Sequence, residues 1–146
     1  MIKVQQQDFD VGAEYQRLAT NCHTGSIVFF VGLVRDMNLG EQVDSLHLEH
    51  YPGMTEKQLA DIVEQAKQRW PIQDANIIHR VGDLEVNQQI VFVGVNSEHR
   101  ETSFAACQFI MDYLKTQATF WKKERGQQGE SWLDARQSDL RATSKW

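Results

Sequence analysis

Two pairs of cationic side chains between residues 99 and 122 carry the charge needed to bind an anion. His99 and Arg100 stand where a helix is expected to begin, and Lys115 and Lys122 lie near and beyond its far end. A helix start favours negative charge, so two cations there oppose the helix dipole. A bound anion would relieve that conflict. A solvent-exposed His-Arg pair is the alternative interpretation, and spacing alone leaves both open.

Arg35 is a further candidate for anion binding. It follows the apolar run GSIVFFVGLV of residues 25–34, whose β-branched and aromatic residues predict a buried strand. Arg35 therefore stands where a strand leaves the core, and its guanidinium could form paired hydrogen bonds to a ligand there. A solvated loop arginine explains the same position equally well.

Metal and thiol chemistry find little support in the sequence. Cys22 and His23 are adjacent, but no second pair follows at ligand spacing. Cys107 falls in an apolar helical stripe, which is typical of an inert packing thiol. His47 and His50 should point to opposite faces of one strand, so they make a poor metal pair. We expect no metal ion and no organic cofactor.

Length and charge exclude several broad classes. The 146 residues fit one domain that spans residues 1–146, and the net charge of -5 argues against a general nucleic-acid-binding protein. No run approaches the roughly 18 apolar residues of a membrane helix, and the start MIKVQQQDFD lacks the apolar core of a signal peptide. Two cysteines without a CxxC motif favour a reducing compartment, so we expect a cytoplasmic protein.

Strands and helices alternate along the chain, which predicts a mixed α/β (α+β) fold. Apolar or alternating patterns predict strands at residues 1–5, 25–34, 46–51, 75–81 and 89–96. Helical spacing predicts helices at residues 10–19, 55–70 and from 98 onward, the last two begun by capping residues at Thr55/Gln58 and Asn96/Ser97. Two short strands should flank the turn GQQG of residues 126–129, and the tail RATSKW of residues 141–146 is either a loose end or an interface strand.

Two further patterns predict which side chains of the third helix face the core and on which face of the hairpin each lysine lies. Phe104, Cys107, Met111 and Leu114 recur at helical steps and should face the core. Alternation along residues 120–125 puts Lys122 on one face and its neighbour Lys123 on the other. Only one of these two lysines can therefore share a pocket with Lys115.

Three long segments occur in an order that resembles a known family. They are LEHYPGMTEK at residues 48–57, IVFVGVNSEHR at 90–100 and FIMDYLKTQATFWKKE at 109–124, supported by VGLVRDMNLG at 31–40 and WLDAR at 132–136. The chain resembles the large, catalytic subunit of molybdopterin synthase, and the likeness runs nearly end to end.

The resemblance implies an α/β hammerhead fold with an additional small antiparallel β subdomain. It also implies a dimer of large subunits, with one small ubiquitin-like sulfur-carrier subunit at each end of a heterotetramer. The carrier's C-terminal Gly-Gly thiocarboxylate would enter a pocket of the large subunit. Its sulfur would be transferred twice to cyclic pyranopterin monophosphate, which gives the dithiolene of molybdopterin.

By motif position, the resemblance also implies a role for individual residues. Lys115 and Lys122 match the essential lysines of the family. The positions that match substrate or anion binding are Arg35, His99, Arg100 and Arg136, and those that match the pocket wall are Phe30 and Met111. Thr119 departs from the family pattern, because a proline commonly precedes the aromatic-Trp-Lys run, and a slightly looser turn is expected there.

Two other functions remain as alternatives. A non-catalytic scaffold that docks a ubiquitin-like protein and retains the pterin phosphate would need the same basic residues. A nucleotide-binding protein is disfavoured, because no Gly-rich loop joins a strand to a helix.

Overall fold

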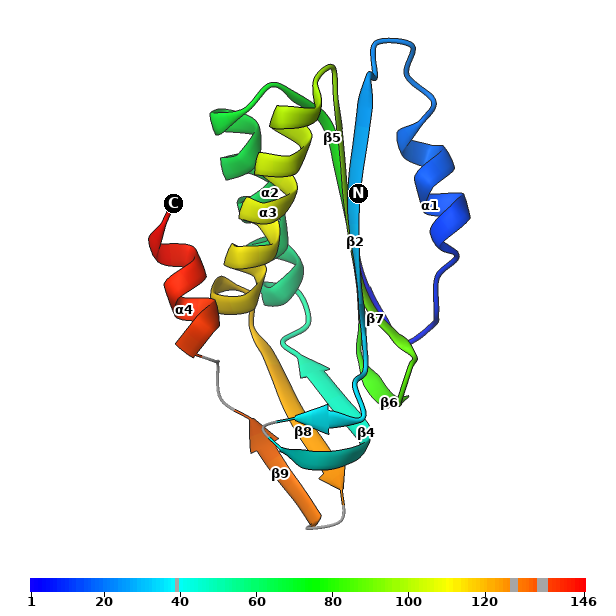
Figure 1. The fold of residues 1–146 in the computed structure, drawn as a ribbon, viewed down its shortest axis with the longest axis vertical. Helices are drawn as coiled ribbons and strands as arrows, with labels where there is room; N and C mark the ends of the chain where they lie inside the picture. Colours follow the sequence, from blue (N-terminus) through cyan, green and yellow to red (C-terminus); the bar gives the residue numbers. More distant parts are fainter. Residues whose placement is uncertain (39, 127–128, 134–136) are drawn as a thin grey trace.

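The computed structural model describes residues 1–38, 40–126, 129–133 and 137–146, which form nine strands and four helices (Figure 1). In chain order the elements are β1 (Ile2–Gln5), α1 (Val11–Leu18), β2 (Ser26–Leu33), β3 (Met37–Asn38), β4 (Glu41–His50), α2 (Met54–Arg69), β5 (Ile72–Arg80), β6 (Gly82–Glu85), β7 (Gln89–Ser97), α3 (Arg100–Gln117), β8 (Phe120–Gly126), β9 (Gly129–Leu133) and α4 (Gln137–Ser144).

The first sheet has the strand order β1-β5-β7-β2. β1 runs parallel to β5, and the other neighbours are antiparallel. Figure 1 shows α1 on one side of this sheet and α2 and α3 on the other. Helices therefore cover both faces, which explains why consecutive residues are buried along β5 from Ala75 to Arg80 and along β7 from Val91 to Ser97.

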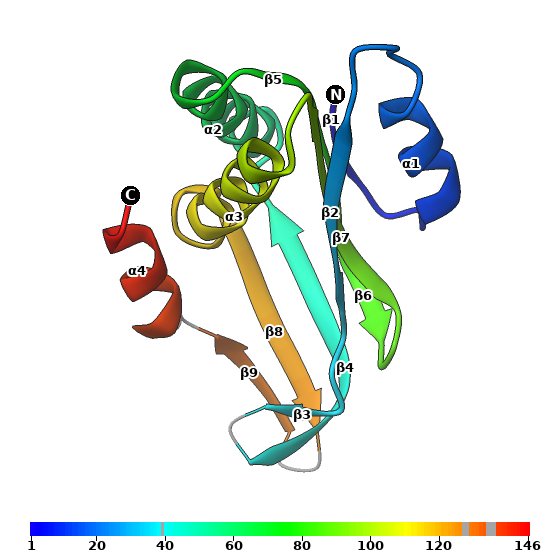
Figure 2. The same ribbon diagram turned by 45° about the horizontal axis from the view of Figure 1, so that its top comes forward.

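The second sheet is antiparallel and smaller. β4 pairs with β8 and β8 pairs with β9, while β3 and β6 flank β4. Figure 2 shows these strands extending away from the helices at one end of the molecule. The mixed α+β class and the small antiparallel subdomain expected from the sequence are both confirmed.

Phe120, at the start of β8, joins the hydrophobic interiors of the two sheets. It packs against the larger core cluster, which includes Phe109 and Leu114, and against the cluster around Leu48 and Leu84. Its ring also stacks on the ring of His79 from β5, with centroids 3.8 Å apart. The chain between α3 and β8 is thus fixed to both sheets.

The starts of α2 and α3 differ from the expected capping. Gly53 is the N-cap residue before α2, and its backbone N–H donates to the Glu56 carboxylate 2.5 Å away, so the Thr55/Gln58 assignment was wrong. His99 precedes the first residue of α3 and makes no side-chain cap, while Asn96 and Ser97 belong to β7. A glycine suits the position before α2, because Gly53 has a φ of 86°, which residues with a side chain rarely adopt.

Three other expectations are corrected. Phe104 does not face the core, since its side chain is 62% exposed. The fourth strand is longer than residues 46–51, because β4 begins at Glu41 and pairs with the short β3. The tail is neither a loose end nor a strand: α4 is a helix that packs on α3, and Trp146 packs against Trp70 and Phe109.

Candidate active site

A cleft of about 370 Å³ opens where the two sheets meet the end of α3 and the start of α4. We call it the cationic cleft. It is lined by Leu33, Val34, Arg35, Asn38, Val43, Leu46, His79, Ile90, Leu114, Lys115, Ala118, Phe120, Lys122, Glu124, Leu133, Ser138 and Asp139. Nine of these seventeen residues are apolar and eight are polar or charged, so the cleft offers both apolar wall and many groups that can orient a ligand.

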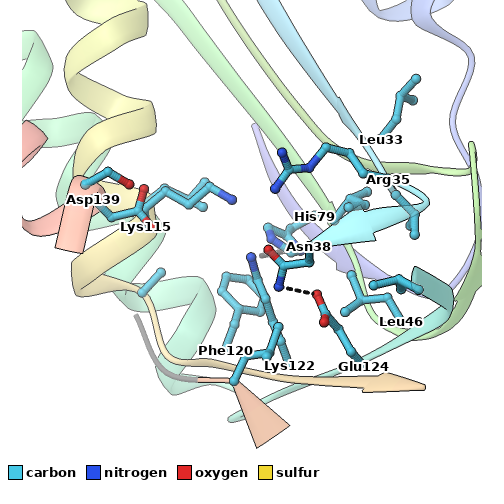
Figure 3. Close-up of a pocket in the computed structure, with 17 residues that line it drawn as sticks. Leu33, Arg35, Asn38, Leu46, His79, Lys115, Phe120, Lys122, Glu124 and Asp139 are labelled. Atoms are coloured by element: carbon cyan, nitrogen blue, oxygen red, sulfur yellow. Dashed lines mark hydrogen bonds between the residues drawn. The ribbon is translucent and has the colours of Figure 1, made fainter. Parts of the chain in front are cut away.

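Three of the expected cations converge in the cationic cleft. Lys115 comes from the last turn of α3, Lys122 from β8, and Arg35 from the segment that follows β2. Figure 3 shows the side chains of Lys115 and Arg35 pointing toward one another across the cleft, with Lys122 rising from the strand below. Elements far apart in the sequence thus bring three positive charges together.

Local structure explains why Lys122 reaches the cleft and Lys123 does not. Phe120, Lys122 and Glu124 alternate along β8 and all line the cleft. Lys123 lies on the opposite face, where its Nζ is 2.7 Å from Glu130 and 5.4 Å from the centre of the Trp132 ring. The expected division of the two lysines is confirmed.

Carboxylates also face the cationic cleft, from β8 and from α4. Glu124 accepts a 2.7 Å hydrogen bond from the Asn38 side-chain amide, and Asp139 lines the cleft on the α4 side. Asn38 therefore holds Glu124 in place with a neutral donor. The cleft is positive in balance, because two lysines and one arginine outnumber these two carboxylates.

His79 forms part of the cleft floor, and its side chain is only 2% exposed. The pKa of its imidazole is lowered to about 3, chiefly by burial and in smaller part by the positive charges of Lys122 and Lys115. A hydrogen bond with the Arg80 carbonyl opposes this shift without overcoming it. His79 is thus uncharged at neutral pH.

The structure does not bring four other expected residues into this cleft. His99 and Arg100 are exposed at the opposite end of α3 from Lys115. Lys115 lies 16 positions after His99, which corresponds to about 24 Å at the rise of an α-helix. Phe30 and Met111 are not among the lining residues either. Arg136 lies outside the described residues.

Sequence reasoning missed five polar residues that line the cleft. They are Asn38, His79, Glu124, Ser138 and Asp139. The alternation that selected Lys122 also selects Glu124, so a signal for that residue was present. His79 gave no signal, because a histidine within an apolar strand is usually a packing residue.

Three observations within the described residues bear on a reactive Cys107 thiol, a metal site and a membrane-spanning helix. Burial raises the pKa of the Cys107 thiol to about 12, which leaves it protonated and unreactive. Across the described part of the chain, no three His, Cys, Asp or Glu side chains gather in a way that could hold a metal ion. Among those same residues, no helix has the length and apolar character to cross a membrane.

Fold and site together define a class: an α+β protein with a cationic, apolar-walled cleft between two sheets, suited to a small anionic ligand. The sequence places the chain more narrowly. It belongs to the MoaE protein family, whose model matches residues 4–117.

Curated relatives and solved structures agree with this membership. The chain is 55% identical to the molybdopterin synthase catalytic subunit of Vibrio cholerae over 99% of its own length and 97% of that protein. It is 53% identical to the protein of the same name from Escherichia coli, with the same coverage of both chains. The molybdopterin biosynthesis MoaE protein from Burkholderia ambifaria superposes with a TM-score of 0.86 at 49% identity, covering 100% of this chain and 97% of the other.

A more distant structure shares the fold. It is a protein-protein complex of subunits 1 and 2 of the molybdopterin-converting factor from Helicobacter pylori, with a TM-score of 0.76 at 19% identity. The match covers 92% of this chain and 91% of the other. The expected fold family is therefore confirmed across a wide range of sequence similarity.

Proposed function

We propose that the chain is the catalytic subunit of a molybdopterin synthase. In this reaction two thiocarboxylated Gly-Gly ends of the small ubiquitin-like carrier subunit each give one sulfur, in two successive transfers, to cyclic pyranopterin monophosphate, and water converts each carrier end to a carboxylate. The product is the dithiolene of molybdopterin. The family and its curated relatives support this reaction class. The observation that carries the proposal is the convergence of Arg35, Lys115 and Lys122 in one cleft.

The chemistry of the cationic cleft fits two anionic reactants. A cyclic phosphate and a thiocarboxylate repel each other, and three cations with apolar walls offset that repulsion more strongly than water does. Arg35 binds the phosphate through forked hydrogen bonds. Lys115 stabilises the charge that develops on the carrier carbonyl and donates a proton, and Lys122 assists it.

The size of the cleft supports the same assignment. Its volume of about 370 Å³ suits one small ligand together with a narrow peptide end, and would not admit a folded domain. The carrier would therefore dock outside and insert only its Gly-Gly tail. The small subunit in the Helicobacter pylori complex is a precedent for such a partner.

A second copy of this chain would bring His99 and Arg100 to a cleft. Within one chain the length of α3 separates these residues from Lys115, so a neighbouring copy is the more direct source of their charge. β2 is the end strand of its sheet among the described strands, and Phe30 on it is 43% exposed. The exposed Phe104 supports an apolar dimer interface close to His99 and Arg100.

The remaining assignments follow from the same proposal. Arg136 would supply a further anion-binding group, and Phe30 and Met111 would form pocket walls once the dimer is assembled. Residues 1–146 would act as one domain, because Phe120 packs against the interiors of both sheets. The unpaired thiols of Cys22 and Cys107 support a cytoplasmic location.

A reconstituted assay tests the proposal. Purified chain, thiocarboxylated carrier and cyclic pyranopterin monophosphate are mixed, and the dithiolene product is measured by fluorescence after oxidation. Wild-type protein should form product, and Lys115→Ala should form none while binding the carrier normally. Lys123→Ala is the matched control, since Lys123 lies on the opposite face of β8 from Lys122. A folded, carrier-binding wild type that made no product would exclude the enzyme.

The alternative is a scaffold that binds the carrier and the pterin without reacting. It needs the same cations but forms no dithiolene, so an active wild type beside a Lys115→Ala protein that binds carrier and pterin without forming product favours the enzyme. Lys115→Arg then separates proton transfer from charge: lost product with the positive charge retained would assign proton donation to Lys115. Undiminished product from Lys115→Arg would show that Lys115 contributes its charge and no proton.

A further inference from the structure

His79 lies beside both lysines of the cationic cleft, yet the proposed reaction assigns it no role. It comes from β5, lines the cleft with Lys115 and Lys122, and is 2% exposed. Its ring stacks on Phe120 at 3.8 Å with an angle of 19° between the planes. Phe120 precedes Lys122 by two residues on the same face of β8. The stack therefore connects the first sheet to the strand that carries Lys122.

The contacts of the His79 ring fix its tautomer. Nδ1 lies 2.9 Å from the backbone carbonyl oxygen of Arg80, and a carbonyl oxygen can only accept. In the neutral ring, Nδ1 therefore carries the hydrogen and donates it. Nε2 is left with a free lone pair on the side of the ring away from the Arg80 backbone. Because His79 lines the cleft, that lone pair is available to groups within it.

The charges around His79 keep the ring neutral. Lys122 on β8, Lys115 on α3 and His50 on β4 all oppose a positive charge on it. The guanidinium of Arg80 is directed elsewhere, since it donates to the carbonyl oxygens of Gln6 and Gln89. The other charged groups that line the cleft are Arg35, Glu124 and Asp139. Two lysines thus face a buried acceptor that does not gain a charge of its own.

A neutral acceptor can orient an ammonium group without cancelling its charge. A carboxylate in the same place would pair with the lysine, and the cleft would then attract an anionic substrate less strongly. A protonated histidine would repel the lysine and could accept no hydrogen bond from it. An imidazole held as the Nδ1–H tautomer avoids both outcomes.

We infer that His79 is a positioning residue for sulfur transfer: its Nε2 accepts a hydrogen bond from a cleft lysine and holds that ammonium, still charged, against the reacting anions. Lys122 is the first candidate, because the ring of His79 stacks on Phe120, which lies two residues before Lys122 on the same face of β8. The inference rests on the proposed function and adds a residue that the family resemblance did not supply.

Two substitutions separate the loss of the Nε2 acceptor of His79 from the loss of its ring stack on Phe120. His79→Phe keeps an aromatic ring for the stack on Phe120 but has no acceptor. His79→Gln loses the ring but places an amide oxygen near the position of Nε2. His47→Phe is the matched control, because His47 lies on another strand, outside the cationic cleft, against Asp83 and Glu49. Each variant is assayed with thiocarboxylated carrier and cyclic pyranopterin monophosphate, alongside its carrier affinity and its pH-rate profile.

His79→Phe should lower kcat by about 10- to 100-fold, the cost of a small misplacement of a reacting group. Its carrier affinity and KM should stay near the wild-type values, and its pH-rate profile should shift. His79→Gln should recover most of the lost rate, and His47→Phe should match wild type. An unchanged kcat in His79→Phe would overturn the inference, as would equal losses in both His79 variants. If the wild type itself forms no product, the proposed function fails instead.

A measurement on the wild-type protein keeps the test independent of folding defects. Long-range ¹H–¹⁵N correlation spectra report the protonation and tautomer of each imidazole. We expect His79 to remain neutral with hydrogen on Nδ1 between about pH 5 and pH 8, while an unperturbed histidine titrates within that range. A hydrogen on Nε2 of His79, or a charged ring at neutral pH, would rule out the acceptor role.

Discussion

The backbone N–H of Thr119 donates a 2.8 Å hydrogen bond to Oε1 of Gln58, which ties the segment before β8 to α2. The hydroxyl of Thr55 donates a second 2.8 Å bond to the Thr119 carbonyl. The backbone N–H and the backbone carbonyl of Thr119 are therefore both hydrogen-bonded. The slightly looser turn expected from the sequence stays a prediction, and these two hydrogen bonds restrain the segment in which it would lie.

Gln58→Ala should loosen the approach to Lys122. The substitution leaves the Thr119 N–H without its acceptor, and a lost hydrogen bond of this kind costs about 1 kcal/mol of stability. The rate of sulfur transfer should fall while carrier affinity is kept. Urea unfolding and the reconstituted assay measure the two effects. Gln65→Ala is the control, because Gln65 is exposed on the same helix. Equal behaviour of the two variants would contradict the prediction.

Mixing two inactive variants should restore activity if a second copy completes each cleft. Lys115→Ala removes a residue of the cleft itself, and Arg100→Ala removes one from the far end of α3. A mixed dimer would then contain one intact site and one doubly damaged site. We expect each variant alone to be impaired and their mixture, after subunit exchange, to regain a substantial part of the wild-type rate. No gain in a mixture that forms mixed dimers would place Arg100 outside the site.

Two sequence patterns predicted part of the site: the alternation of side chains along β8, and the polar segment that follows the apolar run of β2. Lys122 and Arg35 could be found this way, because a period of two fixes which side chains share a face of a strand. Lys115 depended on the family resemblance, since surface lysines near a helix end are common. His79 could not be found from the sequence, because its role depends on the stack with Phe120 from the other sheet.

The order of apolar runs along the chain predicted the fold class. Helical spacing did not predict which side chains of α3 are buried and which are exposed. Ser103 is buried and hydrogen-bonded to Ser26 and Ser97, so the helix meets β2 and β7 through that side. Phe104 follows by one residue, about 100° further around the helix, and reaches the surface instead. Helical spacing marks an apolar stripe and cannot tell a core from an interface between copies.

Alkylation should distinguish the two cysteines. Cys22 is exposed, whereas Cys107 is buried and its pKa is raised to about 12. Iodoacetamide at mildly alkaline pH should therefore modify Cys22 alone in the native protein and both residues after denaturation, as read by mass spectrometry. Cys107→Ala should keep catalytic activity, because the thiol packs in the core and takes no part in the chemistry. Loss of activity in a stable Cys107→Ala protein would contradict that assignment.

Trp146 should anchor α4 beside the cleft. Its indole N–H donates a 2.6 Å hydrogen bond to Asp112, and its ring packs on Trp70 and Phe109. Trp146→Phe keeps much of the packing and loses the donor, whereas Trp146→Ala loses both. Amide exchange in α4 should accelerate modestly in the first variant and strongly in the second. Unchanged exchange in Trp146→Ala would show that α4 is held by other contacts.

Acid should destabilise the folded chain partly through His79. Its folded pKa, about 3, lies below the value of about 6.5 for an unfolded histidine. As the pH falls below about 6.5, His79 binds a proton in the unfolded chain and stays neutral in the folded chain. The stability tied to this residue is therefore complete above that pH and is lost as the pH decreases, by about 2 kcal/mol at pH 5.

His79→Phe removes this dependence, so its free energy of unfolding should fall less steeply than that of wild type between about pH 6.5 and pH 5. His47 supplies a control of opposite sign. Hydrogen bonds from Asp83 and Glu49 raise the pKa of His47, so its stabilising contribution is present at low pH and is lost as the pH rises through the folded value. His47→Phe should therefore lower stability by a nearly constant amount below about pH 6.5 and leave the slope between pH 6.5 and pH 5 close to that of wild type. Parallel curves for wild type and His79→Phe would mean that the imidazole is not buried in its neutral form, which would also remove the basis for its role as an acceptor.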